Sequence, residues 1–316
     1  FNNIKYFASC FPTSKLENYQ ESYNELKNVI QKNNGKLFFV GHHEAHAANA
    51  FFSSNFNDAV IVTIDGGGVE SPEGFVTSLT VFTGKDNKIA SMKPADQPKG
   101  PNVGTDPDHP YLHKWRMIAD QSEQNRFDLA ASLQSATEEY LKNIFDQILD
   151  KFPNKKYLCL SGGVTLNSVF TGKLLEWYEN RLDGVYVTPT PHDGGLSIGA
   201  TQYVWHQILD NPRISWSDHC SPYLGEIYSK KDIEKAIESG RRALGNRSIL
   251  ADPRSPSMKD MINEKVKHRQ WFRPFAPSIL AEEACNWFKQ DIESPYMSFV
   301  VDFKDEVKDK VPAVVH

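Results

Sequence analysis

Two histidines near the beginning of the chain are spaced so that they could hold one metal ion. His42 and His46 are four residues apart in the segment HHEAHAANAFF, and on a helix this spacing puts both imidazoles on one face, about 5–6 Å apart at Cβ. Two carboxylates lie in comparable places, because Asp65 follows an apolar strand pattern and Asp193 precedes a helix pattern. Two imidazoles and two carboxylates suit Fe²⁺, Mn²⁺ or Zn²⁺. The sequence therefore predicts a divalent-metal site.

Each member of this set also has a structural explanation. Histidines at this spacing occur by chance, on a helix surface or at a helix cap, and Asp193 could be the N-cap of the helix that follows it. His43 points about 100° away from the pair on a helix, which makes it a poorer ligand. Asp65 favours the metal hypothesis, because the carboxyl end of a strand is where α/β proteins place metal or phosphate ligands.

A second candidate site is the turn Ser161-Gly162-Gly163, between a predicted buried strand and a helix. Glycines allow a ligand to approach the backbone, and free N–H groups at a helix N-terminus attract phosphate. Asn167, on the first turn of that helix, could reach a nucleotide. The turn lacks the GxGxxG and GK[ST] patterns, so a simple tight turn is the alternative.

A basic segment follows in the last third of the chain. Residues 241–273 contain nine Lys and Arg residues against three Asp and Glu residues, a net charge of +6 in a protein whose formal charge is −5. The arginines are interspersed with Gly, Pro, Asn and aromatic residues rather than alternating with acids. Several converging guanidinium groups would bind a polyanionic small ligand. Structural salt bridges are the alternative.

Alternating strands and helices must position these groups. Apolar runs predict strands at 37–40, 59–64, 74–83, 157–160 and 184–188. Helical patterns span 16–31, 42–52 and 128–149, begin again at Thr165, and cover 196–209. We expect an α/β domain with a largely parallel sheet, irregular loop over 84–124, and a second domain beginning between Asp210 and Tyr223, where the periodicity ends.

Composition excludes several classes of protein. The 316 residues carry 35 Lys+Arg against 40 Asp+Glu, which argues against a general nucleic-acid or anionic-membrane binder. A hydrophobic content of 40% is enough for folded cores in about two domains. No apolar run approaches the ~20 residues of a membrane-spanning helix. The four cysteines are far apart and form no CxxC pair, which is typical of a reducing compartment, so we expect a cytoplasmic protein.

Six motifs resemble those of the O-carbamoyltransferases of the nodulation and antibiotic-tailoring type, the NodU-, CmcH- and TobZ-like family. They are GHHEAHAANAF, IDGGG, LSGGVTLN, PHDGGLSIGA, RALGNRSILADPR and KHRQWFRPFAPSIL. The last two are long and specific, and the resemblance runs from about Lys36 to the end of the chain. It implies an actin-like (ribonuclease H-like) ATP-binding domain at 1–212 and a YrdC-like α/β domain at 213–316.

The resemblance also implies an activity, that of an ATP-dependent O-carbamoyltransferase. The second domain would convert carbamoyl phosphate and ATP to carbamoyl adenylate. The first domain, holding Fe²⁺ or another divalent metal together with nucleotide, would pass the carbamoyl group to a hydroxyl of a small molecule or sugar. Neither nucleic acid nor a membrane would be a partner, and a homodimer is compatible with the family.

The family's functional residues can be carried over by matching motifs. Its metal ligands fall on the residues that the spacing had selected, His42, His46, Asp65 and Asp193. Its nucleotide contacts fall on loop positions at the ends of strands, Gly66, Gly67, Gly162, Gly163 and Asn167. Its carbamoyl-phosphate contacts fall in the basic segment, on Arg242, Lys267 and Arg273, with Arg247 close by. Asp128 matches an acidic position near the acceptor, where it would orient the hydroxyl; a helix cap is the alternative.

The chain also departs from the family pattern. Family members begin with a further strand unit and continue after the last motif with more arginine ligands, so we expect both domains to be incomplete in this chain. Hydrogenase-maturation carbamoyltransferases depend on Cys-rich zinc modules, which this sequence lacks. A tRNA threonylcarbamoyl transferase would not need the RALGNRSILADPR block. A non-catalytic nucleotide- and metal-binding module and a plain actin-like ATPase are the remaining alternatives.

Overall fold

The computed structural model describes residues 4–10, 20–71, 76–93, 96–98, 110–213, 251–290, 292, 294 and 296–315. The chain divides into two compact units, Phe1–Trp216 and Ser217–His316. The division lies inside the stretch where the periodicity of the sequence ends. All four predicted metal ligands belong to the first unit.

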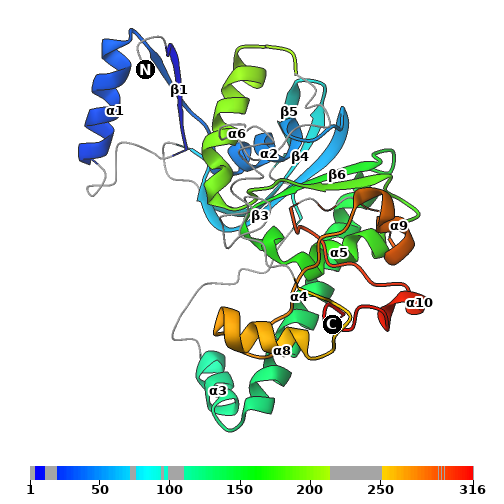
Figure 1. The fold of residues 1–316 in the computed structure, drawn as a ribbon. Helices are drawn as coiled ribbons and strands as arrows, with labels where there is room; N and C mark the ends of the chain where they lie inside the picture. Colours follow the sequence, from blue (N-terminus) through cyan, green and yellow to red (C-terminus); the bar gives the residue numbers. More distant parts are fainter. Residues whose placement is uncertain are drawn as a thin grey trace, which may run out of the picture. The chain divides into compact units, whose positions relative to one another are not determined.

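A five-stranded mixed sheet forms the centre of the first unit (Figure 1). In spatial order its strands are β5 (Lys88–Ser91), β4 (Val76–Lys85), β3 (Asp58–Val69), β6 (Tyr157–Ser161) and β7 (Gly184–Val187). β6 and β7 run parallel to β3, but the β3–β4 and β4–β5 pairs are antiparallel. The expectation of a largely parallel sheet is therefore wrong for these two pairs. Their connections are short, and a parallel crossover needs a dozen or more residues.

Helices cover both faces of this sheet. α2 (His42–Phe52) and α6 (Leu196–Gln202) lie side by side on one face, and α4 (Glu123–Lys151) and α5 (Ser168–Trp177) lie on the other (Figure 1). A π-helical segment, Tyr203–Ile208, continues α6. Alanines and phenylalanines of α2 pack against Ile61 of β3 and Cys159 of β6 in one buried cluster. Small side chains on α2 therefore let this helix lie close to the sheet.

The first unit also contains three elements that the sequence patterns missed, β1 (Tyr6–Ser9), β5 and α3 (Pro110–Ala119). β1 pairs in parallel with the predicted strand β2 (Lys36–Phe39) in a separate two-stranded sheet, and the predicted helix α1 (Gln20–Lys32) connects them. The segment 84–124, expected to be irregular, contains β5, α3 and the start of α4. Proline at the first position of α3 is compatible with a helix, because that position has no intrahelical N–H partner. Composition alone therefore misassigned this segment.

Gly199 is a point of close contact between α6 and α2. A Cβ at this position would overlap the backbone carbonyl oxygen of Ala45 and approach the Asn49 side chain. The absence of a side chain therefore sets the distance between α6 and the helix that carries both predicted histidine ligands.

The Gly199→Ala variant is expected to lower the free energy of unfolding by about 1–3 kcal/mol, because overpacking a close contact outweighs the better helix propensity of alanine. Chemical denaturation measures this change. Ser197→Ala, on an exposed position of the same helix, is the control and should change stability by less than about 0.5 kcal/mol. An unchanged or higher stability of Gly199→Ala would contradict the contact.

The described part of the second unit consists of short helices and turns. They are α8 (Met258–Ile262), a π-helical turn (Asn263–Lys267), a 3₁₀ turn (Ala281–Glu283), α9 (Ala284–Trp287) and α10 (Asp305–Lys308). Phe288 and Phe303 form an isolated antiparallel bridge. Over residues 251–315, apart from the three undescribed positions, the structure assigns no longer strand. None of the described helices of the chain has the length and apolarity needed to cross a membrane.

Candidate metal site

The four predicted metal ligands converge in the first unit. One ligand atom from each of His42, His46, Asp65 and Asp193 lies within 4.8 Å of all the others. The two Nε2 atoms are 3.1 Å apart, and His46 Nε2 is 3.2 Å from Asp65 Oδ2. Asp193 Oδ1 is 3.5 Å from both Nε2 atoms. Two nitrogen and two oxygen donors therefore face one point, which is the arrangement that a divalent cation requires.

Three elements bring these side chains together. The histidines occupy positions i and i+4 at the start of α2, as their spacing predicts. Asp65 lies where the β3–β4 register shifts, between Ile64 and Gly68, and just beyond the last parallel pair with β6. An irregularity of this kind redirects side chains out of the regular pleat. The prediction that β3 ends at Asp65 is therefore wrong, since the strand continues to Val69 with this interruption.

Asp193 is the first residue of a 3₁₀ turn, Asp193–Gly195, that leads into α6. The cap of this turn is His192, whose Nδ1 accepts a hydrogen bond from Gly194 N at 3.0 Å. The alternative reading of Asp193 as an N-cap is therefore wrong. Its carboxylate is 68% exposed, so it faces the histidines from the open side of the cluster.

Backbone groups orient the carboxylate of Asp65. Gly163 N donates to Oδ2 at 3.1 Å and Gly66 N donates to Oδ1 at 2.6 Å. Burial alone would raise the pKa of Asp65, but these two N–H groups and the neighbouring imidazoles hold its pKa below the usual value. Asp65 is therefore a carboxylate, the form that binds a metal.

His46 is held in an equally defined way. Its Nδ1 lies 3.0 Å from Ser161 Oγ, at the end of β6, and its Nε2 faces the other ligands. Complete burial, with His42 alongside, lowers the pKa of His46 to about 4. The imidazole is therefore neutral at neutral pH, which is the state in which histidine coordinates metals.

Gly68 makes room for the other imidazole. A Cβ at this position would overlap the ring and the Cβ of His42. Gly68, the third glycine after Asp65, therefore allows β3 to lie close to α2. The glycine run was predicted to contact nucleotide through Gly66 and Gly67, but nothing in the sequence pattern assigned Gly68 to His42.

Two glutamate side chains cap the N-terminus of α2, the helix that carries the histidines. Gly41 N donates to Glu44 Oε2 at 3.0 Å, and His43 N donates to Glu70 Oε1 at 2.9 Å. Both carboxylates thereby satisfy N–H groups that have no partner within the helix. Burial raises the pKa of Glu70 to about 7. No sequence pattern identifies Glu70, because it lies far along the chain from the helix that it caps.

His43 points away from the cluster. Its Nδ1 is 2.6 Å from Thr63 Oγ1 and its Nε2 is 3.1 Å from the Thr77 carbonyl oxygen. Both ring nitrogens are occupied, so His43 has no donor for a metal, in agreement with the expectation that it is the poorer ligand. Burial lowers its pKa to about 4.

This buried histidine predicts a loss of stability in acid. The unfolded state binds a proton near pH 6.5 and the folded state only near pH 4, so stability is complete above pH 6.5 and falls between pH 6.5 and 4. For metal-free protein taken from pH 7.5 to pH 5, His43 accounts for about 2 kcal/mol of the lost free energy of unfolding. In urea denaturation, His43→Gln should show a correspondingly smaller loss. An equal loss in both proteins would show that His43 does not contribute.

The predicted nucleotide loop has its polar groups largely engaged. Gly162 N donates to the Pro191 carbonyl at 2.7 Å, and Gly163 N donates to Asp65. Asn167 caps α5 by accepting from Phe170 N, and its amide pairs with Gln134 of α4. One function of this turn is therefore structural, because the Gly163 N–H group orients Asp65. A nucleotide bound at the loop would have to contact groups other than these N–H and amide groups.

Asp128 lies in the second turn of α4, on an exposed position, and accepts a hydrogen bond from Gln124 Nε2 at 2.8 Å. The N-cap of α4 is Ser122, whose hydroxyl accepts from Asn125 N at 3.1 Å. The cap alternative for Asp128 is therefore wrong. Its role near an acceptor stays a prediction.

The basic segment divides into engaged and free side chains in the second unit. Arg254 forms an exposed ion pair with Asp252, and Arg269 donates to Asn263 Oδ1 and lies over the ring of Phe275. Lys267 and Arg273 are exposed, and among the described residues neither forms an ion pair. Arg242 and Arg247 lie outside the described residues. Salt bridging therefore explains Arg254 but not Lys267 or Arg273.

The buried side chain of Asn263 organises the loop between Lys267 and Arg273. Its Nδ2 donates to the carbonyl oxygens of Trp271 and Arg273, at 3.1 and 2.9 Å, while its Oδ1 accepts from Arg269. His268 ends the π-helical turn Asn263–Lys267 with a left-handed backbone conformation, at φ 48°, and so lets the chain turn back toward Asn263. The two predicted carbamoyl-phosphate contacts are thereby fixed on one short loop.

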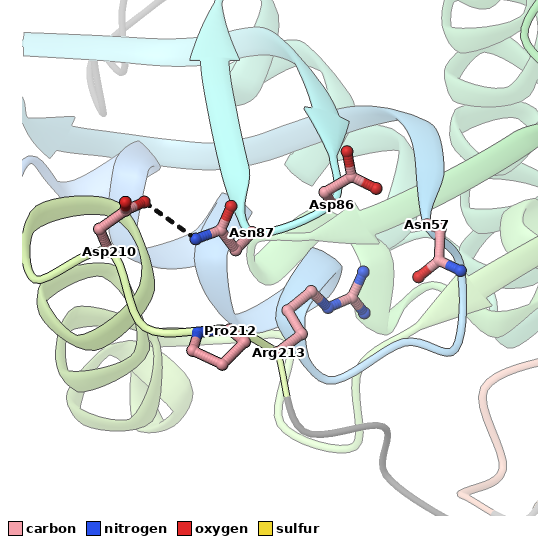
Figure 2. Close-up of a pocket in the computed structure, with 6 residues that line it drawn as sticks. All are labelled: Asn57, Asp86, Asn87, Asp210, Pro212 and Arg213. Atoms are coloured by element: carbon pink, nitrogen blue, oxygen red, sulfur yellow. Dashed lines mark hydrogen bonds between the residues drawn. The ribbon is translucent and has the colours of Figure 1, made fainter.

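A pocket elsewhere in the first unit shares no residue with the metal cluster (Figure 2). It has a volume of about 370 Å³ and is lined by Asn57, Asp86, Asn87, Asp210, Pro212 and Arg213. The guanidinium of Arg213 donates to the backbone carbonyls of Phe51, Ser54 and Phe56. Arg213 thus anchors the chain after α6 against the end of α2, and three of the five N–H donors of its guanidinium are used for this.

Comparisons with known proteins match both halves of the chain to one family. Residues 102–202 match the family model described as carbamoyltransferase N-terminus, and residues 231–316 match that described as carbamoyltransferase C-terminus. The chain is 28% identical over 366 residues to nodulation protein NolNO of Sinorhizobium fredii, covering 89% of this chain and 53% of that protein. It is 36% identical over 187 residues to nodulation protein U of Rhizobium tropici, covering 52% and 32%.

A third relative is an uncharacterized protein of Synechocystis sp., which is 28% identical over 382 residues. The match covers 90% of this chain and 62% of the Synechocystis protein. The chain thus spans 53% of the length of NolNO and 62% of the length of the Synechocystis protein.

Proposed function

This chain belongs to the carbamoyltransferase family, and on that basis we propose that the protein is an ATP-dependent O-carbamoyltransferase whose first unit holds a divalent metal. The observation that carries the proposal is the convergence of His42, His46, Asp65 and Asp193 within 4.8 Å. In overall reaction, carbamoyl phosphate, ATP and one water would give carbamoyl adenylate, phosphate and pyrophosphate. The carbamoyl group would then pass to a hydroxyl of a small molecule or sugar, releasing AMP.

The donor set fits Fe²⁺ or a related cation. Two imidazoles and a carboxylate held by backbone N–H groups suit such an ion, and the exposed Asp193 leaves one side of the cluster open to a ligand. A metal bound here would supply Lewis-acid stabilisation to the phosphate of the adenylate. The residues of this chain would fix its position, because Gly163 and Gly66 orient Asp65 and Ser161 contacts His46.

The strand order supports an actin-like assignment for the first unit. An antiparallel meander, β3–β4–β5, is extended on its other side by β6 and β7, which return in parallel through α4 and α5. This arrangement is the one expected of a ribonuclease H-like sheet. A YrdC-like second unit rests on the resemblance of its motifs, and Lys267 and Arg273 would offset the charge of carbamoyl phosphate there.

The test of the proposal needs no acceptor. Pyrophosphate release by the complete gene product is measured with ATP, with and without carbamoyl phosphate, after anaerobic loading with Fe²⁺. Release that requires carbamoyl phosphate is the expected result. Phosphate release indifferent to carbamoyl phosphate would show an actin-like ATPase instead, and the absence of any turnover would favour a binding module.

A further inference from the structure

We propose that Ser161 is a positioning residue that fixes the ring proton of His46 on Nδ1 and so presents an unprotonated Nε2 to the metal. This inference rests on the proposed function. Its basis is the position of the Ser161 hydroxyl, which is completely buried at the end of β6. The hydroxyl lies between His46, a predicted ligand, and the loop that carries Asp193, another predicted ligand.

The direction of the hydrogen bonds follows from the partners of Ser161. Its Oγ is 3.1 Å from the Pro191 carbonyl oxygen and 3.0 Å from His46 Nδ1. A carbonyl oxygen can only accept, so the single hydroxyl proton of Ser161 goes to Pro191. The hydroxyl oxygen must then accept from His46, which places the ring proton of His46 on Nδ1. In the metal-free protein the unprotonated Nε2 of His46 can accept from His42 Nε2, which lies 3.1 Å away.

The opposite assignment leaves a buried repulsion. If Ser161 donated to His46, two oxygen atoms without an intervening proton would face each other between Ser161 and Pro191. The Pro191 carbonyl also accepts from Gly162 N at 2.7 Å, so it is already oriented toward this turn. An unsatisfied contact of this kind is costly where water has no access.

The same contact connects two ligands of the cluster. Pro191 lies two residues before Asp193 in the loop that precedes α6. Ser161 therefore ties the orientation of the His46 ring to the position of the loop that carries Asp193. Partners that set the tautomer of a histidine ligand typically change metal affinity about 10- to 100-fold when they are removed.

The experiment reads the tautomer and the metal affinity separately. Long-range ¹H–¹⁵N spectra of the complete, metal-free protein with labelled histidine distinguish the two neutral tautomers, and a His46→Gln variant assigns the signal. Mn²⁺ affinity is then measured for wild type, Ser161→Ala and Thr165→Val. Thr165→Val is the matched control, because it removes another buried hydroxyl of the same turn, one that bonds to the Gly162 carbonyl and not to His46.

We expect His46 to carry its proton on Nδ1 in wild type and in Thr165→Val. In Ser161→Ala the Nε2-protonated tautomer should gain population and the Kd for Mn²⁺ should rise about 10- to 100-fold. An Nε2-protonated His46 in wild type, or Ser161→Ala with unchanged tautomer and Kd, would overturn the proposal. Failure of wild type to bind Mn²⁺ would overturn the proposed metal site itself, while the metal-free spectra would still decide the direction of the Ser161 hydrogen bond.

Discussion

Protein carrying both His42→Ala and His46→Ala is expected to retain no stoichiometric metal and to lose carbamoyl transfer. The two substitutions remove both nitrogen donors of the cluster and leave Asp65 and Asp193 facing each other without them. Loss of a partner that only orients a ligand costs up to about 100-fold in metal affinity, so the loss of two ligands should exceed this. Metal content of the purified, Fe²⁺-loaded protein is the measurement.

The control for this double variant is His113→Ala. His113 is exposed on α3 and takes no part in the cluster, so its removal should leave metal content unchanged. Because His46 is completely buried and its truncation leaves a cavity, circular dichroism first checks that the double variant is folded. Stoichiometric iron in the folded double variant would refute the metal assignment.

The second large effect concerns the second unit, where Arg273→Ala is expected to abolish the use of carbamoyl phosphate and to leave metal content intact. Arg273 is exposed and free of ion pairs among the described residues, so its charge is available to an anion. Loss of one group that stabilises developing charge typically lowers the rate about 100-fold or more. Carbamoyl-phosphate-dependent pyrophosphate release measures the effect, and Arg242→Ala should behave in the same way.

Arg254→Ala is the matched control in the same basic segment. Its guanidinium forms an exposed ion pair with Asp252, and such pairs contribute little to stability. The control should therefore keep both carbamoyl-phosphate use and metal content. Full activity of Arg273→Ala would exclude this residue as a contact, whereas simultaneous loss of activity and metal would indicate a misfolded protein.

Much of the first unit follows from local sequence patterns. The helix over 42–52 coincides with α2, and the apolar runs at 37–40, 157–160 and 184–188 coincide with β2, β6 and β7 to within one residue at each end. These patterns are short-range properties of the chain, because the periodicity of apolar residues is fixed by helix and strand geometry. Of the segments that failed, β1 and β5 are only four residues long, and pairing with neighbouring strands stabilises them. α3 does carry apolar residues at helical spacing, at Leu112, Trp115 and Ile118, but it lies in a stretch rich in Pro, Gly and Asp that was assigned as loop from its composition.

The candidate site shows the same division. Residue types and spacing selected His42, His46, Asp65 and Asp193 without a fold, because the chemistry of metal ligation limits the choice to few side chains. The supporting contacts could not be selected in this way. The pattern around Ser161 and Gly163 predicted a phosphate or nucleotide loop, not support for the metal ligands, and no pattern assigned a role to Gly68. Each of the three acquires its supporting task only from a partner distant along the chain.

By itself, therefore, the sequence indicated the carbamoyltransferase family, most elements of the α/β unit and four residues that could bind a metal. Only the tertiary structure decided that β4 and β5 return antiparallel, that Asp65 lies at an interruption of β3, and that His192 rather than Asp193 caps the turn before α6. The reason is physical: spacing along the chain fixes which groups share one helix or strand, whereas hydrogen-bond direction and close approach depend on atoms that folding brings from elsewhere.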